Sequence, residues 1–298
     1  GIQIHREVQA ACKAYQTWGK EDKISEQGLV EELLQVLNQV MPKLDEVPGR
    51  TWNQARLYAP QVAHFLATTD KEVVAQSLLA DLMDRMGSYN STVACNYQEA
   101  LKYHKKALEM RRVLYKDKGE HSDIACSLNN LGIVYYSLRQ YEEALKYHKK
   151  ALEMYQQVYI GNHPDIANSL NNIGYVYQGS GQYEEALRYY KKSLKIFQAI
   201  DTGNHPIIAN SLHNLGIIYQ ALGKYKKALK YSKQALNMNE ALYIGNHPDI
   251  AISLNNIAAA HKALGDHQEA LRYYKKALKI FQAIDTGNHP DIANLLHN

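Results

Sequence analysis

Apolar residues recur along most of the chain in stripes whose members lie three or four positions apart. In residues 162–203, one stripe runs from Ile166 to Tyr177 and a second runs from Tyr183 to Phe197. This spacing places each stripe on one face of an α-helix. The pattern predicts two helices in this segment, and neither helix can bury its stripe without a neighbour.

The ends of these two predicted helices carry residues that favour such places. Pro164 stands in the first turn of a helix, where a proline is tolerated, and His163 before it is the expected N-cap. The sequence GSGQ separates the two helices, and DTGNHP ends the second. Small residues at Gly174 and Ala186 indicate where the two helices approach each other most closely.

The two-helix pattern returns with a fixed period. Histidines that stand 42 residues apart mark the copies: His121, His163, His205, His247 and His289. A further copy begins at Tyr97, with a longer loop after it. We therefore divide the chain into a helical N-terminal region, 1–70, and a repeat array, 71–298. The array should comprise a degenerate repeat at 71–119, full repeats at 120–161, 162–203, 204–245 and 246–287, and a partial repeat at 288–298.

Most copies contain Leu-x-x-Ile/Leu-Gly-x-x-Tyr in the first helix and Tyr-x-x-Ala-Leu-x-x-Tyr/His in the second. This pattern resembles the tetratricopeptide repeat (TPR). The period and the opening NHPDIA are most similar to the long repeats of kinesin light chains and of many bacterial repeat proteins. The resemblance implies an all-α fold, an α-solenoid with a right-handed TPR superhelix after a short helical N-terminal region. Ala258 and His261 replace the usual glycine and tyrosine, so we expect looser packing in the last full repeat.

The first ninety residues show helical spacing without the repeat pattern, and they predict four helices and no strands. The sequence IHREVQ, with His5, Val8 and Gln9, and the later LYAPQVAHFL resemble the linker before TPR arrays in bacterial ATPases of the NB-ARC type. Gln61 departs from that pattern, in which a histidine often follows the proline. The chain has no G-x-x-x-x-G-K-[ST] phosphate loop, so this resemblance implies a nucleotide-binding domain upstream of Gly1.

Composition excludes several classes of protein. The three cysteines are too few and too scattered for a disulfide framework, and they indicate a reducing compartment. No segment is long and apolar enough to span a membrane, and no signal peptide is visible. We therefore expect a cytoplasmic protein with no membrane partner. The formal net charge of +4 is small and says little about partners.

Candidate chemistry is equally sparse. The histidines show no His-x-x-x-His spacing, and the repeat-boundary histidines should lie too far apart to share an ion, so no metal is expected. The lysine pairs at Lys149 and Lys191 follow Glu142 and Glu184 at spacings that favour pairing within the helix. That pattern favours a solvated outer face over a nucleic-acid surface. No nucleophile–base set occurs outside the repeats, so we expect a protein with no catalytic activity and no cofactor.

Asparagines recur at the same position in the first helix of each copy. They cost roughly half a kcal/mol each against alanine inside a helix, so local preference does not explain them. The polar face of the first helix is thus rich in amides and nearly uncharged, while that of the second carries lysine and glutamate.

In TPR proteins the first helix of each pair lines the concave groove, and an asparagine two residues before the glycine clamps a bound peptide. Asn130, Asn172 and Asn214 match that position. The resemblance implies a non-catalytic module that binds a protein or an extended peptide in the groove. The candidate groove residues are Asn129, Asn130, Asn168, Asn171, Asn172, Tyr175, Gln178, Asn210, His213, Asn214, Gln220, Asn255, Asn256 and Lys262. Because Lys262 is the one cation at a comparable place, a ligand with a terminal carboxylate is not favoured.

Three alternatives stay open at this point. The amides can bridge adjacent repeats and stiffen the stack. The chain can be the ligand-sensing C-terminal fragment of a larger NB-ARC-type ATPase. It can also be an architectural spacer or a self-assembly unit. Asn298 stands in the middle of a predicted first helix, so we expect a longer array. The uncapped C-terminal end of this chain is where self-association is possible.

Overall fold

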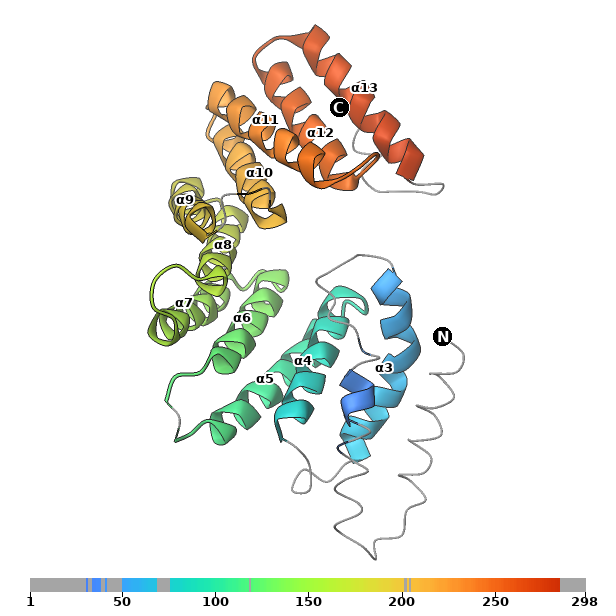
Figure 1. Cartoon of the computed structure of the whole chain (residues 1–298), viewed down its shortest axis with the longest axis vertical. Coiled ribbons are helices and arrows are strands. Elements are labelled where there is room, and N and C mark those ends of the chain that lie inside the picture. Colours follow the sequence, from blue (N-terminus) through green and yellow to red (C-terminus); the bar gives the residue numbers. More distant parts are fainter. Residues whose placement is uncertain are drawn as a thin grey trace, which may run out of the picture. The chain divides into compact units, whose positions relative to one another are not determined.

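The computed structural model describes residues 50–68, 76–117, 119–200 and 205–284, together with Glu31, residues 34–38, Met41 and Gly203. Within these ranges all regular secondary structure is helical, as predicted (Figure 1). The helices predicted before residue 31 and the partial repeat at 288–298 lie outside the described residues. The chain forms two compact units, residues 1–158 and residues 159–298, and each is described by itself.

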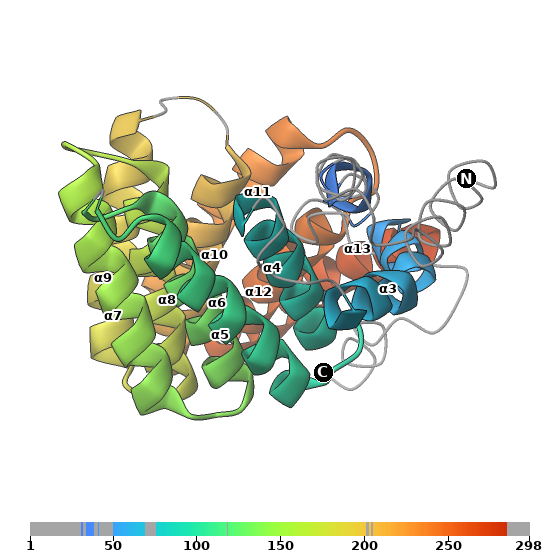
Figure 2. The ribbon, with the colours of Figure 1, turned by 90° about the horizontal axis from the view of Figure 1, so that it is seen from below.

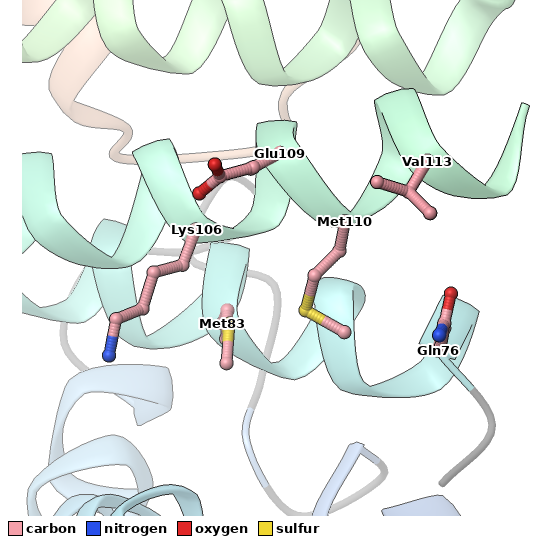
Figure 3. A pocket seen from close by; sticks show the side chains of 6 residues that line it. All are labelled: Gln76, Met83, Lys106, Glu109, Met110 and Val113. Carbon is pink, nitrogen blue, oxygen red and sulfur yellow. The ribbon is translucent and has the colours of Figure 1, made fainter. Parts of the chain in front are cut away.

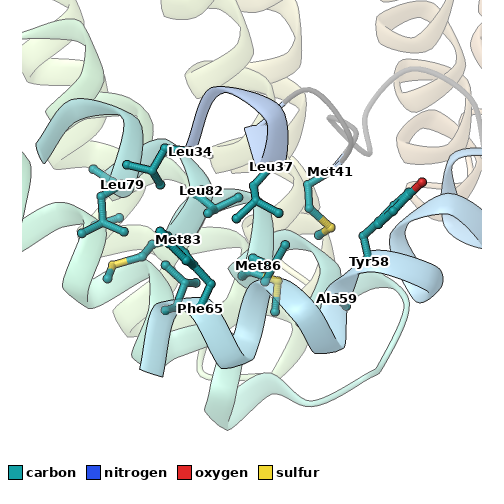
Figure 4. Close-up of a cluster of buried hydrophobic side chains, with 14 of the residues drawn as sticks. Leu34, Leu37, Met41, Tyr58, Ala59, Phe65, Leu79, Leu82, Met83 and Met86 are labelled. Atoms are coloured by element: carbon teal, nitrogen blue, oxygen red, sulfur yellow. The ribbon is translucent and has the colours of Figure 1, made fainter. Parts of the chain in front are cut away.

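The first unit contains five of the labelled helices. One of them precedes the helix pairs, and the other four form two pairs. They are α3 (Arg50–Thr68), α4 (Gln76–Thr92), α5 (Tyr97–Leu114), α6 (Ser122–Ser137) and α7 (Tyr141–Val158). The pairs are α4 with α5 and α6 with α7. Helix α3 packs on α4, and both contribute to a core that includes Leu37, Phe65, Leu82 and Met86 (Figure 4).

The second unit contains three pairs. They are α8 (Pro164–Gly179) with α9 (Tyr183–Ile200), α10 (Pro206–Ala221) with α11 (Tyr225–Leu242), and α12 (Pro248–Ala263) with α13 (His267–Ile284). Successive pairs join where α9 packs on α10 and α11 packs on α12 (Figures 1 and 2). Helices α10 and α12 thus each contribute to a core shared with the preceding second helix. This arrangement of stacked pairs confirms the α-solenoid class.

Histidine caps begin the first helices, as the sequence predicts. Nδ1 of His163 accepts a hydrogen bond from the backbone N–H of Asp165, at 3.3 Å. The same cap occurs at His121, His205 and His247. The ring of Tyr159 stacks on His163 with the ring centroids 3.4 Å apart, which holds the imidazole in its capping orientation.

Glycine allows the two helices of a pair to come into contact. A Cβ at Gly174 would stand 2.7 Å from Cε1 of Tyr190, far inside van der Waals distance. Gly132 meets the ring of His148 in the same way, and Gly216 meets the hydroxyl of Ser232. The small residues therefore mark the closest approach of the helices, as predicted.

A second aromatic contact joins the two helices of each pair from α6–α7 to α12–α13, near the turn between them. Tyr135 stacks on Tyr147, Tyr177 on Tyr189 and Tyr219 on Tyr231, with ring centroids 5.2, 5.4 and 5.2 Å apart. In the last pair His261 takes the tyrosine position and stacks on Tyr273 at 5.6 Å. The histidine therefore keeps the ring contact that its position requires.

A buried charge network joins α4 to α5 and α6 in the first unit. Asp84 is 8% exposed, and its Oδ1 lies 2.7 Å from Nδ1 of His104. Its other oxygen pairs with Arg111, which also donates to Ser127 on α6. Burial acts to raise the pKa of Asp84, but the hydrogen bond from His104 and the charge of Arg111 outweigh it and lower that pKa. The carboxylate therefore stays ionised inside the protein.

Candidate functional site

All fourteen candidate residues lie on first helices. Asn129 and Asn130 are on α6 in the first unit, and the others are on α8, α10 and α12 in the second. On α8 these are Asn168, Asn171, Asn172, Tyr175 and Gln178; on α10, Asn210, His213, Asn214 and Gln220; on α12, Asn255, Asn256 and Lys262.

Their exposure varies more than the sequence pattern indicates. Asn210 and Lys262 are exposed, and the side chain of Tyr175 is 39% exposed. Asn214 is only 1% exposed, so its amide faces protein rather than solvent. The remaining candidates are half-buried. Most of the candidate side chains are therefore at least partly accessible to solvent, whereas that of Asn214 is buried.

Two hydrogen bonds link successive first helices. The hydroxyl of Tyr175 on α8 donates to Oδ1 of Asn214 on α10, at 3.4 Å. Nδ2 of Asn256 on α12 donates to Nδ1 of His213 on α10, at 2.8 Å. Adjacent repeats in the second unit are therefore bridged by residues of the candidate set.

Other candidates bond within their own pair. Oδ1 of Asn129 lies 2.8 Å from Nδ1 of His148 on α7. The hydroxyl of Tyr190 on α9 donates to Oε1 of Gln178, at 2.7 Å. These two amides thus fix the second helix against the first.

Three candidate side chains each contain one buried polar atom that forms no hydrogen bond with a described residue. Oδ1 of Asn171, Nδ2 of Asn214 and Oδ1 of Asn255 are buried without a partner among the described residues. A buried polar atom that lacks a partner costs roughly 1–3 kcal/mol. A ligand that formed a hydrogen bond with one of these atoms would recover that cost.

A pocket of about 600 Å³ brings three candidates together in the second unit. Gln220 on α10 lines it with Asn255 and Asn256 on α12. Apolar side chains, among them Ile217 and Ala259, complete its wall. Its volume falls in the range of roughly 300–1,000 Å³ that is usual for ligand pockets.

A second pocket, of about 230 Å³, lies between α4 and α5 in the first unit (Figure 3). It is lined by Gln76, Met83, Lys106, Glu109, Met110 and Val113. Sequence reasoning missed it because the repeat pattern is weakest before Tyr97. None of the candidate residues lines it.

Two buried histidines on this framework are held neutral. Burial lowers the pKa of His148 to about 4. Burial also lowers the pKa of His213, and the nearby charge of Asp249 offsets part of that effect. Because neutral His213 has a free lone pair on Nδ1, it can accept the hydrogen bond from Asn256.

The outer face carries charged residues that form ion pairs within one helix, but the cations in the pairs below are not the lysines named from the sequence. Lys146 lies 3.1 Å from Glu143, and Arg188 lies 2.6 Å from Glu185. Such exposed pairs contribute little to stability. Lys191 instead lies over the ring of Tyr219, with Nζ 5.7 Å from the centroid, so this lysine also packs against the following repeat.

Neither a metal centre nor a membrane span can be assigned to the described part of the chain. His, Cys, Asp and Glu side chains there do not gather in the groups of three that would hold an ion. No described helix combines the length and apolar character needed to cross a membrane.

Comparison with curated protein sequences finds no match. Among solved structures, a putative kinesin light chain from Podosopora anserina with nearly identical TPR-like repeats is similar, at 22% identity and a TM-score of 0.59 over 71% of this chain and 99% of that one. NprR in complex with its cognate peptide NprX is 20% identical, with a TM-score of 0.61 over 90% of this chain and 72% of that one.

A STAND protein (Signal Transduction ATPase with Numerous Domains) from Pyrococcus horikoshii, which has a tetratricopeptide repeat sensor, is also similar in fold. It is 18% identical, with a TM-score of 0.61 over 88% of this chain and 37% of that one. Two family models described as tetratricopeptide repeat match the sequence itself, one at residues 96–123 and the other in overlapping copies over residues 123–298. These matches cover well over half of the sequence, and the chain therefore belongs to the tetratricopeptide repeat family.

Proposed function

We propose that the chain is a non-catalytic interaction module that binds an extended peptide or protein segment along its first helices. The observation that carries this proposal is the pocket lined by Gln220, Asn255 and Asn256. It joins the candidate amides of two successive repeats in one cavity of ligand size.

The chemistry of this face suits a peptide backbone. A neutral amide offers both a donor and an acceptor, which matches the N–H and C=O groups of an extended segment. Each such hydrogen bond contributes about 1 kcal/mol net. Several bonds in step with the repeats would add up to a useful affinity, while neutral histidine at position 213 keeps charge away from the face.

The family and its structural neighbours support the same reading. TPR domains are interaction scaffolds, and NprR is similar in fold and was solved with its cognate peptide. The identity of 20% carries the fold to this chain. The nature of the ligand here is therefore our proposal.

The test is a selection of random linear peptides, displayed on phage, against the immobilised protein. The affinity of the selected peptides is then measured by fluorescence anisotropy. Gln220→Ala should weaken binding roughly five-fold, because it removes about 1 kcal/mol of hydrogen bonding. Gln234→Ala on the exposed face of α11 is the matched control and should leave affinity unchanged. Equal affinity for Gln220→Ala and the wild type would contradict the assigned face.

A further inference from the structure

The last described pair, α12–α13, departs from the pairs before it at two adjacent positions. Ala258 and Ala259 stand where α6, α8 and α10 carry a glycine followed by a large side chain. The earlier residues are Gly132 and Ile133, Gly174 and Tyr175, and Gly216 and Ile217. Both departures change what surrounds Tyr274 on α13, at the repeat position of Tyr190 on α9.

The first departure, Ala258, keeps the ring of Tyr274 out of the position that the ring of Tyr190 occupies in its own pair. Tyr190 is fully buried because Gly174 leaves room for its ring, and a Cβ there would stand 2.7 Å from it. Ala258 has that Cβ. Tyr274 is accordingly half-buried, and its side chain lines the pocket of about 600 Å³ described above.

The second departure removes the aromatic neighbour. The ring of Tyr175 meets Tyr190 edge to face, with the centroids 5.9 Å apart and the planes at 89°. Ala259 supplies no ring at the same repeat position, and Tyr274 has no ring contact with any described residue. The side chain of Tyr274 therefore faces a space that a tyrosine partly fills in the earlier pair.

The rest of the wall is neutral. None of the side chains that line the pocket carries a charge at neutral pH, and Tyr225 adds a second aromatic ring. A charged side chain would lose hydration on entry without gaining a counter-charge. An aromatic side chain would bury a large area and add a favourable edge-to-face contact.

We propose that this pocket is the anchor site for an uncharged aromatic side chain of the bound peptide. The anchor ring packs against Tyr274 as Tyr175 packs against Tyr190, and the amides of Asn255 and Asn256 hold the adjoining backbone. This inference rests on the proposed function and adds to it the chemistry of the residue that the site selects.

The experiment uses the same displayed library of random linear peptides, selected against the wild-type chain. Selected peptides should share one aromatic position, and replacing that residue by lysine should weaken binding at least roughly tenfold. Ala259→Tyr introduces a tyrosine at the repeat position that Tyr175 occupies on α8. The variant should therefore fold, and the new ring should fill the pocket. We expect it to bind the selected peptides roughly tenfold more weakly.

Ile133→Tyr is the matched control, because it places the same ring at the same repeat position on α6, outside the pocket. It should bind as the wild type does. Peptides that bind Ala259→Tyr at full strength but lose affinity for Gln220→Ala would overturn the anchor site and leave the proposed function standing. A library that yields no binders would overturn both.

Discussion

The imidazole of His148 lies across Gly132, so close that a Cβ on the glycine would be 2.6 Å from the ring. The side chain is 1% exposed, and its Nδ1 lies 2.8 Å from Oδ1 of Asn129. The amide oxygen accepts a hydrogen bond from the proton on Nδ1, and burial disfavours a second proton on the ring. This contact therefore favours neutral imidazole.

The first prediction is that stability falls as the pH drops from 7 to 5. Burial lowers the pKa of folded His148 from 6.5 to about 4. Between these values the unfolded chain binds more protons than the folded one, so acid favours unfolding. This single group should remove about 2 kcal/mol between pH 7 and pH 5. Urea unfolding followed by circular dichroism at the two pH values measures the change.

The control for this prediction is His148→Ser, which installs the residue that faces Gly216 as Ser232. The variant is expected to be less stable at pH 7 but to lose about 2 kcal/mol less on acidification than the wild type does. Burial also lowers the pKa of His213, but His213 stays in both proteins, so its contribution cancels. Identical pH dependence in the two proteins would show that His148 is not the titrating group.

The second prediction concerns the contact between Gly174 and Tyr190. Gly174→Ala puts a methyl group into the tyrosine ring and should cost about 1–3 kcal/mol of stability, as overpacking does. Thermal and urea unfolding measure the loss. Gly179→Ala, at the exposed end of the same helix, should change stability by no more than about 1 kcal/mol. If both variants unfold alike, the helices of this pair can separate without cost.

The third prediction concerns the buried charges of the first unit. Arg111→Met leaves the carboxylate of Asp84 buried without its cation and should cost about 3–5 kcal/mol. The double variant Asp84→Leu/Arg111→Met should recover most of that loss, because it removes both charges together. Urea unfolding of the wild type, the single variants Asp84→Leu and Arg111→Met, and the double variant gives the coupling. Full additivity of the two changes would mean that the pair does not interact.

Much of the fold could be predicted because each repeat carries its own local signals. Pro164 and His163 mark a helix start, and the stripe from Ile166 to Tyr177 marks the buried face, so the element boundaries follow from the sequence. The glycine positions gave the closest approach of the helices for the same reason. Tetratricopeptide repeats and the all-α class were therefore identified correctly.

The site was less predictable because it depends on contacts between repeats. Asn214 follows the same pattern as Asn172, but Tyr175 of the preceding repeat bonds to it and it is buried. No periodic pattern encodes that contact. The anchor pocket arises from two departures, Ala258 and Ala259, acting on Tyr274 of the next helix. The Asp84 network was missed because the repeat pattern is weakest before Tyr97.

The last prediction separates the two roles of the amide row. Asn256 donates to half-buried His213, so Asn256→Ala removes a bridge between repeats and leaves Nδ1 without its donor. This variant should lose about 1–3 kcal/mol of stability. Asn172 is half-buried and has no hydrogen bond with a described residue. Asn172→Ala should therefore preserve the melting temperature, while the library-selected peptides bind roughly five-fold more weakly.

Thermal unfolding and fluorescence anisotropy on the same two variants decide between the roles. A stability loss in Asn172→Ala with unchanged affinity would assign that amide to the bridge between repeats and remove it from the ligand face. Asn237→Ala, an exposed asparagine on α11, controls for the gain in helix propensity of roughly half a kcal/mol that any such substitution brings. Because this gain acts in the opposite direction to a lost bridge, a drop in stability after Asn256→Ala reports the loss of the side chain's contacts, among them its hydrogen bond with His213.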